Sequence, residues 1–385
     1  MKQRSFISTK PKKSIYFNLN ILLKLFRMFG IDVCTFSAHV EKEKMLMHVT
    51  RNLWKFSLIF QVITLIVFTF FTVASEKDIK RIFVLLGLAI NVIMIWVYVY
   101  KFQTKNQKAL LKLINVGRML EISPPHKLMS VFTFLFTFAC FMTALIRIYT
   151  RHESISYRIF RDITFDLINL NSTDWRAKAL IEFFSVLYQL TFSHFLVFIW
   201  YFTAFYIIIC RCIVLLLSKH IDLNKRILTY CAIKPGHYDS CLLRYDSIIK
   251  IFSEVNSNLS FPVFSLITYN ALGILYGVTS MIKNDISIQQ LLFSISNFTI
   301  FTGITIFASA VNEADKKAKT SNVNVVKRLI LYDNYHVKTK MENLKQEFYT
   351  PPFVLTGWIF FEFTGNLYLT ATGSIMTYSL LLANM

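Results

Sequence analysis

The side chains best suited to a chemical task are small polar groups along the last apolar stretch of the sequence. Thr370, Thr377 and Asn384 recur at intervals of seven residues, which places them on one face of a helix. Glu362 precedes this stripe and Tyr378 adjoins it. Such groups line cation pathways, but hydroxyl groups that bond to their own helix backbone give the same pattern. The stripe predicts either a pore-lining or a self-bonded helix, with Glu362 near a cation path or at the membrane interface.

A second set of candidates combines aromatic rings with a few hydrogen-bonding groups in the outer halves of the third to sixth apolar stretches. A mostly apolar pocket of this kind suits a small organic ligand, although ordinary helix packing would explain the same composition. We expect His194 to form a hydrogen bond inside the bundle rather than to bind a metal. Arg147 lies either at the interface or in a water-filled outer cavity. The candidate ligand-binding residues are Phe141, Arg147, Tyr188, Phe192, His194, Tyr276, Asn297 and Phe298.

Motifs for catalysis and cofactor binding are absent from the sequence. It contains no glycine-rich phosphate loop, no paired metal ligands at helical spacing and no nucleophile elbow. Cys210 and Cys212 lie two residues apart without further ligands at a zinc spacing, so we expect them to pack in the core. The sequence therefore predicts no enzyme, no cofactor and no metal site.

Seven long apolar stretches must position the candidate side chains. Each reaches the roughly 18 apolar residues that a helix needs to cross a bilayer, and charged residues make up only 17% of the chain. We therefore expect an all-α integral membrane protein with seven transmembrane helices. Gly273 and Gly277 have the spacing that permits close helix approach. The stretches are Trp54–Ala74, Ile82–Tyr100, Leu128–Tyr149, Phe183–Leu216, Phe261–Ile282, Ile288–Val311 and Phe353–Leu382.

Basic residues are distributed unevenly between the stretches. Four segments hold 30 lysines and arginines, whereas the three that alternate with them hold nine. Because basic residues collect on the cytoplasmic side, we expect a cytoplasmic amino terminus and an extracellular carboxyl terminus. Asn171 begins a glycosylation sequon in an expected external segment. Contact with anionic membrane lipid, rather than nucleic acid, explains the net charge of +20. The richer segments are 1–53, 101–127, 218–260 and 312–352, and the poorer ones are 75–81, 150–178 and 283–287.

The basic internal segments carry helical patterns, with apolar residues at helical intervals between lysines and arginines. Such helices must bury their apolar stripes. They could pack against each other below the membrane as the anchor of a symmetric assembly, or lie flat on the inner leaflet. The chain is therefore expected to contain a cytoplasmic tail 1–53, spans 1–6 within 54–311, cytoplasmic helical extensions at 101–127 and 218–260, a cytoplasmic anchor segment 312–352 and a pore-lining last span 353–385.

A short element near the end of the chain begins with Thr377 and Tyr378. Five residues separate this pair from Asn384 and Met385. Together with seven spans, an internal tail and long internal helices, the element resembles the arthropod (insect-type) chemoreceptor superfamily. The gustatory branch of that superfamily closes with Thr-Tyr, five apolar residues and Gln-Phe, from which Ser379 and the final pair depart. The Thr-Tyr pair favours the gustatory receptor family over the odorant receptor family.

This resemblance implies a ligand-gated, nonselective cation channel of the plasma membrane. Four identical or related subunits would assemble through the cytoplasmic helices, and the last span would line a central pore. Each subunit would bind a small organic tastant in an outer-leaflet pocket, and Asn384 would lie near the pore constriction. The alternative within the superfamily is an odorant receptor subunit of a heteromeric channel.

Two other classes of membrane protein fit the sequence less well. A G-protein-coupled receptor would place its amino terminus outside, and the Asp-Arg-Tyr and Asn-Pro-x-x-Tyr signatures of that class are absent. A transporter is disfavoured because no repeat of span pairs is visible and because only ten glycines occur in 385 residues.

Overall fold

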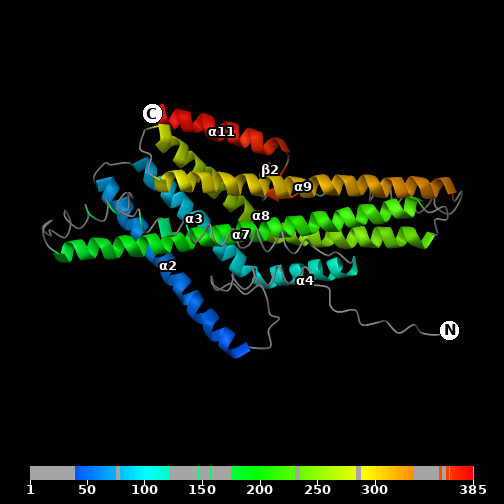
Figure 1. The fold of residues 1–385 in the computed structure, drawn as a ribbon, viewed down its shortest axis with the longest axis horizontal. Helices are drawn as coiled ribbons and strands as arrows, with labels where there is room; N and C mark the ends of the chain where they lie inside the picture. The colour runs from blue at the N-terminus through cyan, green and yellow to red at the C-terminus, as the bar shows by residue number, and fades with distance from the viewer. Residues whose placement is uncertain are drawn as a thin grey trace.

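The structure, a computed structural model, is almost entirely helical in the part of the chain that it describes (Figure 1). It describes residues 40–74, 79–120, 175–229, 235–282, 288–332, 355–357, 361–363 and 365–384, with isolated residues between 142 and 161. The elements are α2 (Val40–Ala74), α3 (Ile79–Lys101), α4 (Gln103–Met119), α7 (Trp175–Thr229), α8 (Pro235–Ile282), α9 (Ile288–Tyr332), β1 (Thr356–Gly357), β2 (Phe361–Glu362) and α11 (Gly365–Asn384).

Three long helices, α7, α8 and α9, form the body of the fold. They contain 55, 48 and 45 residues, and a helix of 55 residues is about 80 Å long. A bilayer core is only about 30 Å thick, so each helix carries a membrane-length apolar part and a long extension. Pro235 is the first residue of α8, a position at which a helix tolerates proline. Pro262 lies inside the same helix and removes one backbone hydrogen bond there.

The extensions of the long helices lie together at one end of the molecule (Figure 1). On that side α4 packs along α8, and Lys112 of α4 contacts Glu254 of α8. Arg328 of α9 donates a hydrogen bond to the carbonyl of Leu228 in α7. The extensions therefore pack against each other, which was the first of the two arrangements considered from the sequence. We call α4 with residues 218–229, 243–260 and 312–328 the extension bundle.

Within the described residues, three helices are long and apolar enough to cross a membrane: α7, α8 and α9. A fourth is present if α3 and α4, which bend by 65° at Phe102, count as one span. The first predicted stretch lies inside α2, and the predicted third stretch falls mostly outside the described residues. The count of seven spans and their orientation remain predictions.

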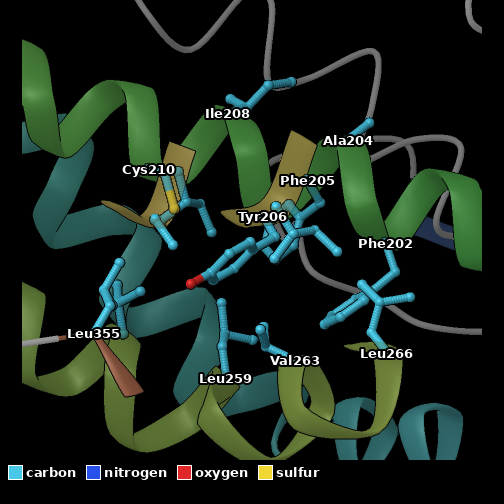
Figure 2. Packing of buried hydrophobic residues seen from close by; sticks show 14 of the residues in the cluster. Phe202, Ala204, Phe205, Tyr206, Ile208, Cys210, Leu259, Val263, Leu266 and Leu355 are labelled. Atoms are coloured by element: carbon cyan, nitrogen blue, oxygen red, sulfur yellow. The ribbon is translucent and has the colours of Figure 1, made fainter. Parts of the chain in front are cut away.

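The hydrophobic core runs along the contact between α7 and its neighbours. Figure 2 shows Phe202 and Tyr206 of α7 facing the α8 side chains Leu259 and Val263. Cys210 and Cys212 are buried free thiols in this region, as the sequence predicted. The largest fully buried side chains are Trp54, Phe198, Phe202, Phe252, Phe301 and Phe363.

Helices α8 and α9 approach closely at the two glycines of α8. A Cβ atom at Gly277 would lie 1.6 Å from Ser294 Oγ, and one at Gly273 would lie 2.5 Å from Asn297 Nδ2. Only glycine fits at both positions, so the glycine pair does mark a close helix contact. Both α9 side chains bond to their own helix: Ser294 Oγ donates to the carbonyl of Gln290 at 2.8 Å, and Asn297 Nδ2 donates to the carbonyl of Phe293 at 2.7 Å.

The last predicted span differs from the structure in where its helix begins. The sequence predicted a helix from residue 353, but α11 begins only at Gly365. Before it, β1 and β2 pair in an antiparallel hairpin, with Thr356 opposite Glu362 and Gly357 opposite Phe361. Hydropathy alone did not reveal the hairpin, because its residues are as apolar as those of a membrane helix.

Candidate ligand cavity and pore helix

A small cavity lies between four helices. Its volume is about 10 Å³, which is room for about one water molecule. One amide and seven apolar or aromatic side chains form its wall. They are Gln61 from α2, Leu88, Ala89 and Val92 from α3, Tyr188, Phe192 and Phe195 from α7, and Tyr269 from α8.

Gln61 is the amide group in this wall, and it ties α2 to α7. Its Nε2 donates to the backbone carbonyl of Tyr188 at 3.3 Å and to Thr191 Oγ1. Thr191 Oγ1 in turn lies 3.0 Å from the carbonyl of Leu187. A buried amide is stable only when it is hydrogen-bonded, so these bonds fix both the position of Gln61 and the wall segment around Tyr188.

Two of the predicted ligand-binding residues line this cavity. Tyr188 and Phe192 lie one turn apart on α7 and stack with ring centroids 6.0 Å apart. Tyr188 is buried and Phe192 half-buried. An aromatic pair with an amide beside it can hold a flat organic molecule by stacking and by one hydrogen bond.

The other predicted ligand-binding residues that the structure describes lie elsewhere. His194 packs edge-on against Trp54, with ring centroids 4.7 Å apart. Tyr276 and Asn297 belong to the contact between α8 and α9, where Gln290 Nε2 donates to the Tyr276 hydroxyl at 3.4 Å. Phe298 is 41% exposed. Phe141, Arg147 and the predicted glycosylation site Asn171 lie outside the described residues.

The contribution of α2 and α3 to the cavity was not predicted from the sequence. The pocket was predicted among the third to sixth stretches, whereas Gln61, Leu88, Ala89 and Val92 come from the first and second. One signal was available, since Gln61 is a lone amide inside an otherwise apolar stretch. A polar group in a membrane helix faces the protein interior, which would have directed attention to α2.

The predicted polar stripe of α11 lies on its exposed side. Leu367, Ala371 and Ile375 pack against the core, and Ser379 is fully buried. Thr370, Gly373 and Thr377 are exposed on the opposite face, and a Cβ at Gly373 would meet nothing within 4 Å. Thr377 Oγ1 also donates to the carbonyl of Gly373 at 2.9 Å. Thr377 therefore bonds to its own helix and is also exposed, and the pore-lining role of the stripe stays a prediction.

The remaining predicted pore residues occupy different places. Tyr378 is 62% exposed on α11, and Asn384 is the last residue of that helix. Glu362 is exposed but lies in strand β2, before the helix. Glu362 therefore does not share the helical face of Thr370 and Thr377, because it belongs to the hairpin and not to α11.

The extension bundle contains a buried polar network between α7 and α9. His220 Nε2 lies 2.7 Å from Asn322 Oδ1, and Asn224 Nδ2 donates to the same oxygen at 2.7 Å. Nearby, the Tyr245 hydroxyl donates to Asp315 Oδ1 at 2.8 Å. Burial lowers the pKa of His220, and burial together with the Asp315 carboxylate raises the pKa of Tyr245. Such groups stabilise one specific alignment of helices because every misaligned pair leaves a buried polar atom unsatisfied.

No group of three histidine, cysteine or acidic side chains that could hold a metal ion occurs in the described part of the chain. The described residues thus form a helical fold with a small, mostly aromatic and apolar cavity and a separate, exposed polar face on α11.

The fold of this chain is similar to that of a solved insect olfactory receptor. The structure of the olfactory receptor OR5 from Machilis hrabei matches it with a TM-score of 0.67 and 12% sequence identity, over 95% of this chain and 98% of that chain. The same receptor in complex with eugenol matches with a TM-score of 0.57 and 12% identity, over 96% and 99%. No protein-family model matches the chain, and no curated protein matches its sequence.

Proposed function

We propose that this chain is a subunit of an insect-type chemoreceptor, a ligand-gated and nonselective cation channel of the plasma membrane. The observation that carries this proposal is the likeness to an insect olfactory receptor over nearly the whole of both chains. In this proposal the chain has seven spans, a cytoplasmic amino terminus and an extracellular carboxyl terminus.

The ligand in this proposal is a small organic molecule that enters the cavity beside Tyr188 and Phe192. The neighbouring receptor was solved with eugenol, a small aromatic compound. A cavity of about 10 Å³ is far below the roughly 300–1,000 Å³ of a typical ligand pocket. A ligand must therefore move the wall residues when it binds. Binding that favours an expanded cavity shifts the protein towards a second conformation, which is what a ligand-gated channel requires.

The pore in this proposal is lined by the exposed face of α11. Thr370, Gly373 and Thr377 face away from the subunit, and their small polar groups suit a hydrated cation path. Leu369 and Met376 are also more than half exposed on α11, so the helix needs partners beyond its own subunit. Four subunits arranged around α11, held together by their extension bundles, would cover these surfaces.

Two observations bear on the type of stimulus, and each favours a different kind of receptor. Thr377 and Tyr378 favour a gustatory receptor that opens on a soluble tastant. The two matching structures described above are of an olfactory receptor, which favours an odorant receptor subunit of a heteromeric channel. A single ligand panel that contains both kinds of compound distinguishes the two.

Patch-clamp recording of the expressed chain tests the proposed function. Eugenol, sucrose and caffeine are applied to whole cells and then to excised outside-out patches. At least one compound should evoke a cation current that reverses near 0 mV and persists in the excised patch. A current that disappears on excision indicates a soluble messenger, and it would contradict direct gating. If the chain expressed alone gives no current, co-expression with a second receptor subunit tests the heteromeric alternative. The absence of a current from both preparations rejects the proposed channel.

The proposed orientation is tested by tags and by glycosylation. An amino-terminal tag should stain only permeabilised cells, whereas a carboxyl-terminal tag should stain intact cells. Asn171→Gln should abolish a mass shift that an endoglycosidase removes from the wild type. Staining of the amino-terminal tag on intact cells favours a G-protein-coupled receptor instead.

A further inference from the structure

The hairpin in front of α11 is held by side chains from two different helices. β1 and β2 pair with each other, and Phe363 N donates to the carbonyl of Leu355 at 3.1 Å. A pair of two-residue strands is not stable by itself. The contacts that hold it must therefore come from its surroundings, which are α8 and α9 (Figure 1).

Asn312 of α9 holds both arms of the hairpin at once. Its Nδ2 donates to the carbonyl of Phe363 at 2.8 Å, and its Oδ1 accepts from the backbone N–H of Leu355 at 2.8 Å. The amide thus behaves like one more peptide group in the ladder, with its donor and its acceptor both used. Leu355 and Phe363 are each only 1% exposed, so no water competes for these bonds.

Asn256 of α8 holds the next residue of the same arm. Its Oδ1 accepts from the backbone N–H of Thr356 at 3.3 Å, and its Nδ2 lies 3.5 Å from Thr356 Oγ1. The consecutive residues Leu355 and Thr356 are therefore bonded to different helices. Any sliding of α8 relative to α9 must strain or break one of these two attachments.

Helix α8 also reaches the ligand cavity. Tyr269 lines the cavity and lies 13 residues from Asn256 on the same helix, which is about 20 Å along the axis. α11 packs on α8 and begins directly after the hairpin. One continuous helix thus connects the cavity wall to the segment from which the proposed pore helix starts.

We propose that Asn312 and Asn256 are positioning residues for channel gating, because together they clamp Leu355, Thr356 and Phe363 between α8 and α9 and so set the placement of α11. This inference rests on the proposed function, in which α11 lines the pore. Movement of α8 on ligand binding is passed to α11 through the clamp. A weakened clamp changes the balance between closed and open channels without changing the cavity or the pore lining.

The test uses two substitutions at Asn312 and a matched control. Asn312→Ala removes both bonds, and Asn312→Asp keeps the acceptor for Leu355 N–H but places an oxygen against the carbonyl of Phe363. Asn322→Ala is the control, because Asn322 is a buried asparagine of the same helix whose bonds run to His220 and Asn224 of α7 rather than to the hairpin. Surface protein, ligand-free current and EC50 are measured with whichever of eugenol, sucrose and caffeine opens the wild type.

Both Asn312 variants should change the EC50 or the ligand-free fraction of the current by about fivefold or more, with an unchanged reversal potential. Asn322→Ala should lower the amount of surface protein but leave the EC50 within about twofold of the wild type. A purely structural role for Asn312 would lower surface protein alone, and that result overturns the proposal. An equal EC50 shift in Asn322→Ala overturns it as well, because any loosened helix contact would then suffice.

Asn256→Ala keeps the proposal testable if the Asn312 variants do not reach the surface. Asn256 is only half-buried and its bonds are longer, so its loss costs less stability. By itself, Asn256→Ala should change the EC50 or the ligand-free fraction of the current, with an unchanged reversal potential. Where Asn312→Ala does reach the surface, the two shifts should have the same direction, and the double variant should shift the EC50 by less than the two single effects combined. A wild type that gives no ligand-evoked current, either alone or with a second receptor subunit, refutes the proposed function, whereas a responsive wild type with unshifted clamp variants refutes only the clamp.

Discussion

Replacing Gly277 by alanine is expected to force α8 and α9 apart. The new Cβ would lie 1.6 Å from Ser294 Oγ and 2.6 Å from Ser294 Cβ, and both distances are far below a van der Waals contact. The hydroxyl could rotate away only by losing its bond to the carbonyl of Gln290 at 2.8 Å. The Ser294 Cβ cannot rotate away, because the backbone of α9 fixes its position.

The cost of this change combines two effects. Overpacking of a tight interior contact destabilises a protein by about 1–3 kcal/mol, and a lost buried hydrogen bond adds about 1 kcal/mol. We therefore expect Gly277→Ala to lower the free energy of unfolding by about 2–4 kcal/mol. The detergent-solubilised protein is heated and then analysed by size-exclusion chromatography, and the melting temperature is read from the loss of its monodisperse peak. Surface expression in cells is measured as well.

A compensating substitution separates this mechanism from a general loss of stability. With Ser294→Gly, the nearest remaining atom of residue 294 is its Cα, 3.6 Å from the new Cβ, which is an ordinary contact. The double variant should therefore be more stable than Gly277→Ala alone. Gly303→Ala is the matched control, because its Cβ would meet only the flexible end of Ile207 at 3.3 Å. If Gly277→Ala melts at the same temperature as Gly303→Ala, the inferred approach of the two helices is wrong.

Three further predictions concern the cavity, the pore face and the extension bundle. Gln61→Met should lower the free energy of unfolding by about 1–2 kcal/mol in the same melting assay, because the side chain loses its bonds to the Tyr188 carbonyl and to Thr191 Oγ1; an unchanged melting temperature would contradict this role. Thr377→Cys should allow a charged thiol reagent to reduce the ligand-evoked current, whereas Ser379→Cys should not react, since Ser379 is fully buried; equal block of both would place α11 differently. Burial lowers the pKa of His220 in the folded chain. In the unfolded chain, His220 has its ordinary pKa of about 6.5, so near that pH the unfolded chain binds a proton that the folded chain does not bind. Stability should therefore fall as the pH falls from 7.5 to 5.5, and His220→Gln should melt with a smaller pH dependence; an equal dependence in both proteins would show that other groups cause it.

The long helices could be predicted because their signal is local. The predicted stretches at 183–216, 261–282 and 288–311 all lie within α7, α8 and α9. Gly273 and Gly277 also gave the correct kind of contact, since only glycine allows two helices to approach so closely. The polar stripe of α11 was visible for the same reason, because residues seven apart share a helix face.

The cavity wall could not be predicted in the same way. Tyr188 and Phe192 were recognised as aromatic candidates, but their partners Leu88, Ala89 and Val92 are ordinary apolar residues of another helix. Nothing in a periodic pattern states which face of α3 meets which face of α7. That choice depends on how the whole set of helices packs, so His194 and Phe298 were included although they lie elsewhere in the structure.

The sequence by itself determined where this chain is apolar, where it is basic and where its helices run, because hydropathy and helical periodicity are properties of neighbouring residues. Only the tertiary structure decided where the last helix begins. The hairpin before Gly365 depends on Asn312 and Asn256, which bond to it from 43 and 100 residues away. Hydrogen bonds over such separations leave no periodic trace in the sequence, and they form only once the packing of α8 against α9 has brought their donors and acceptors together.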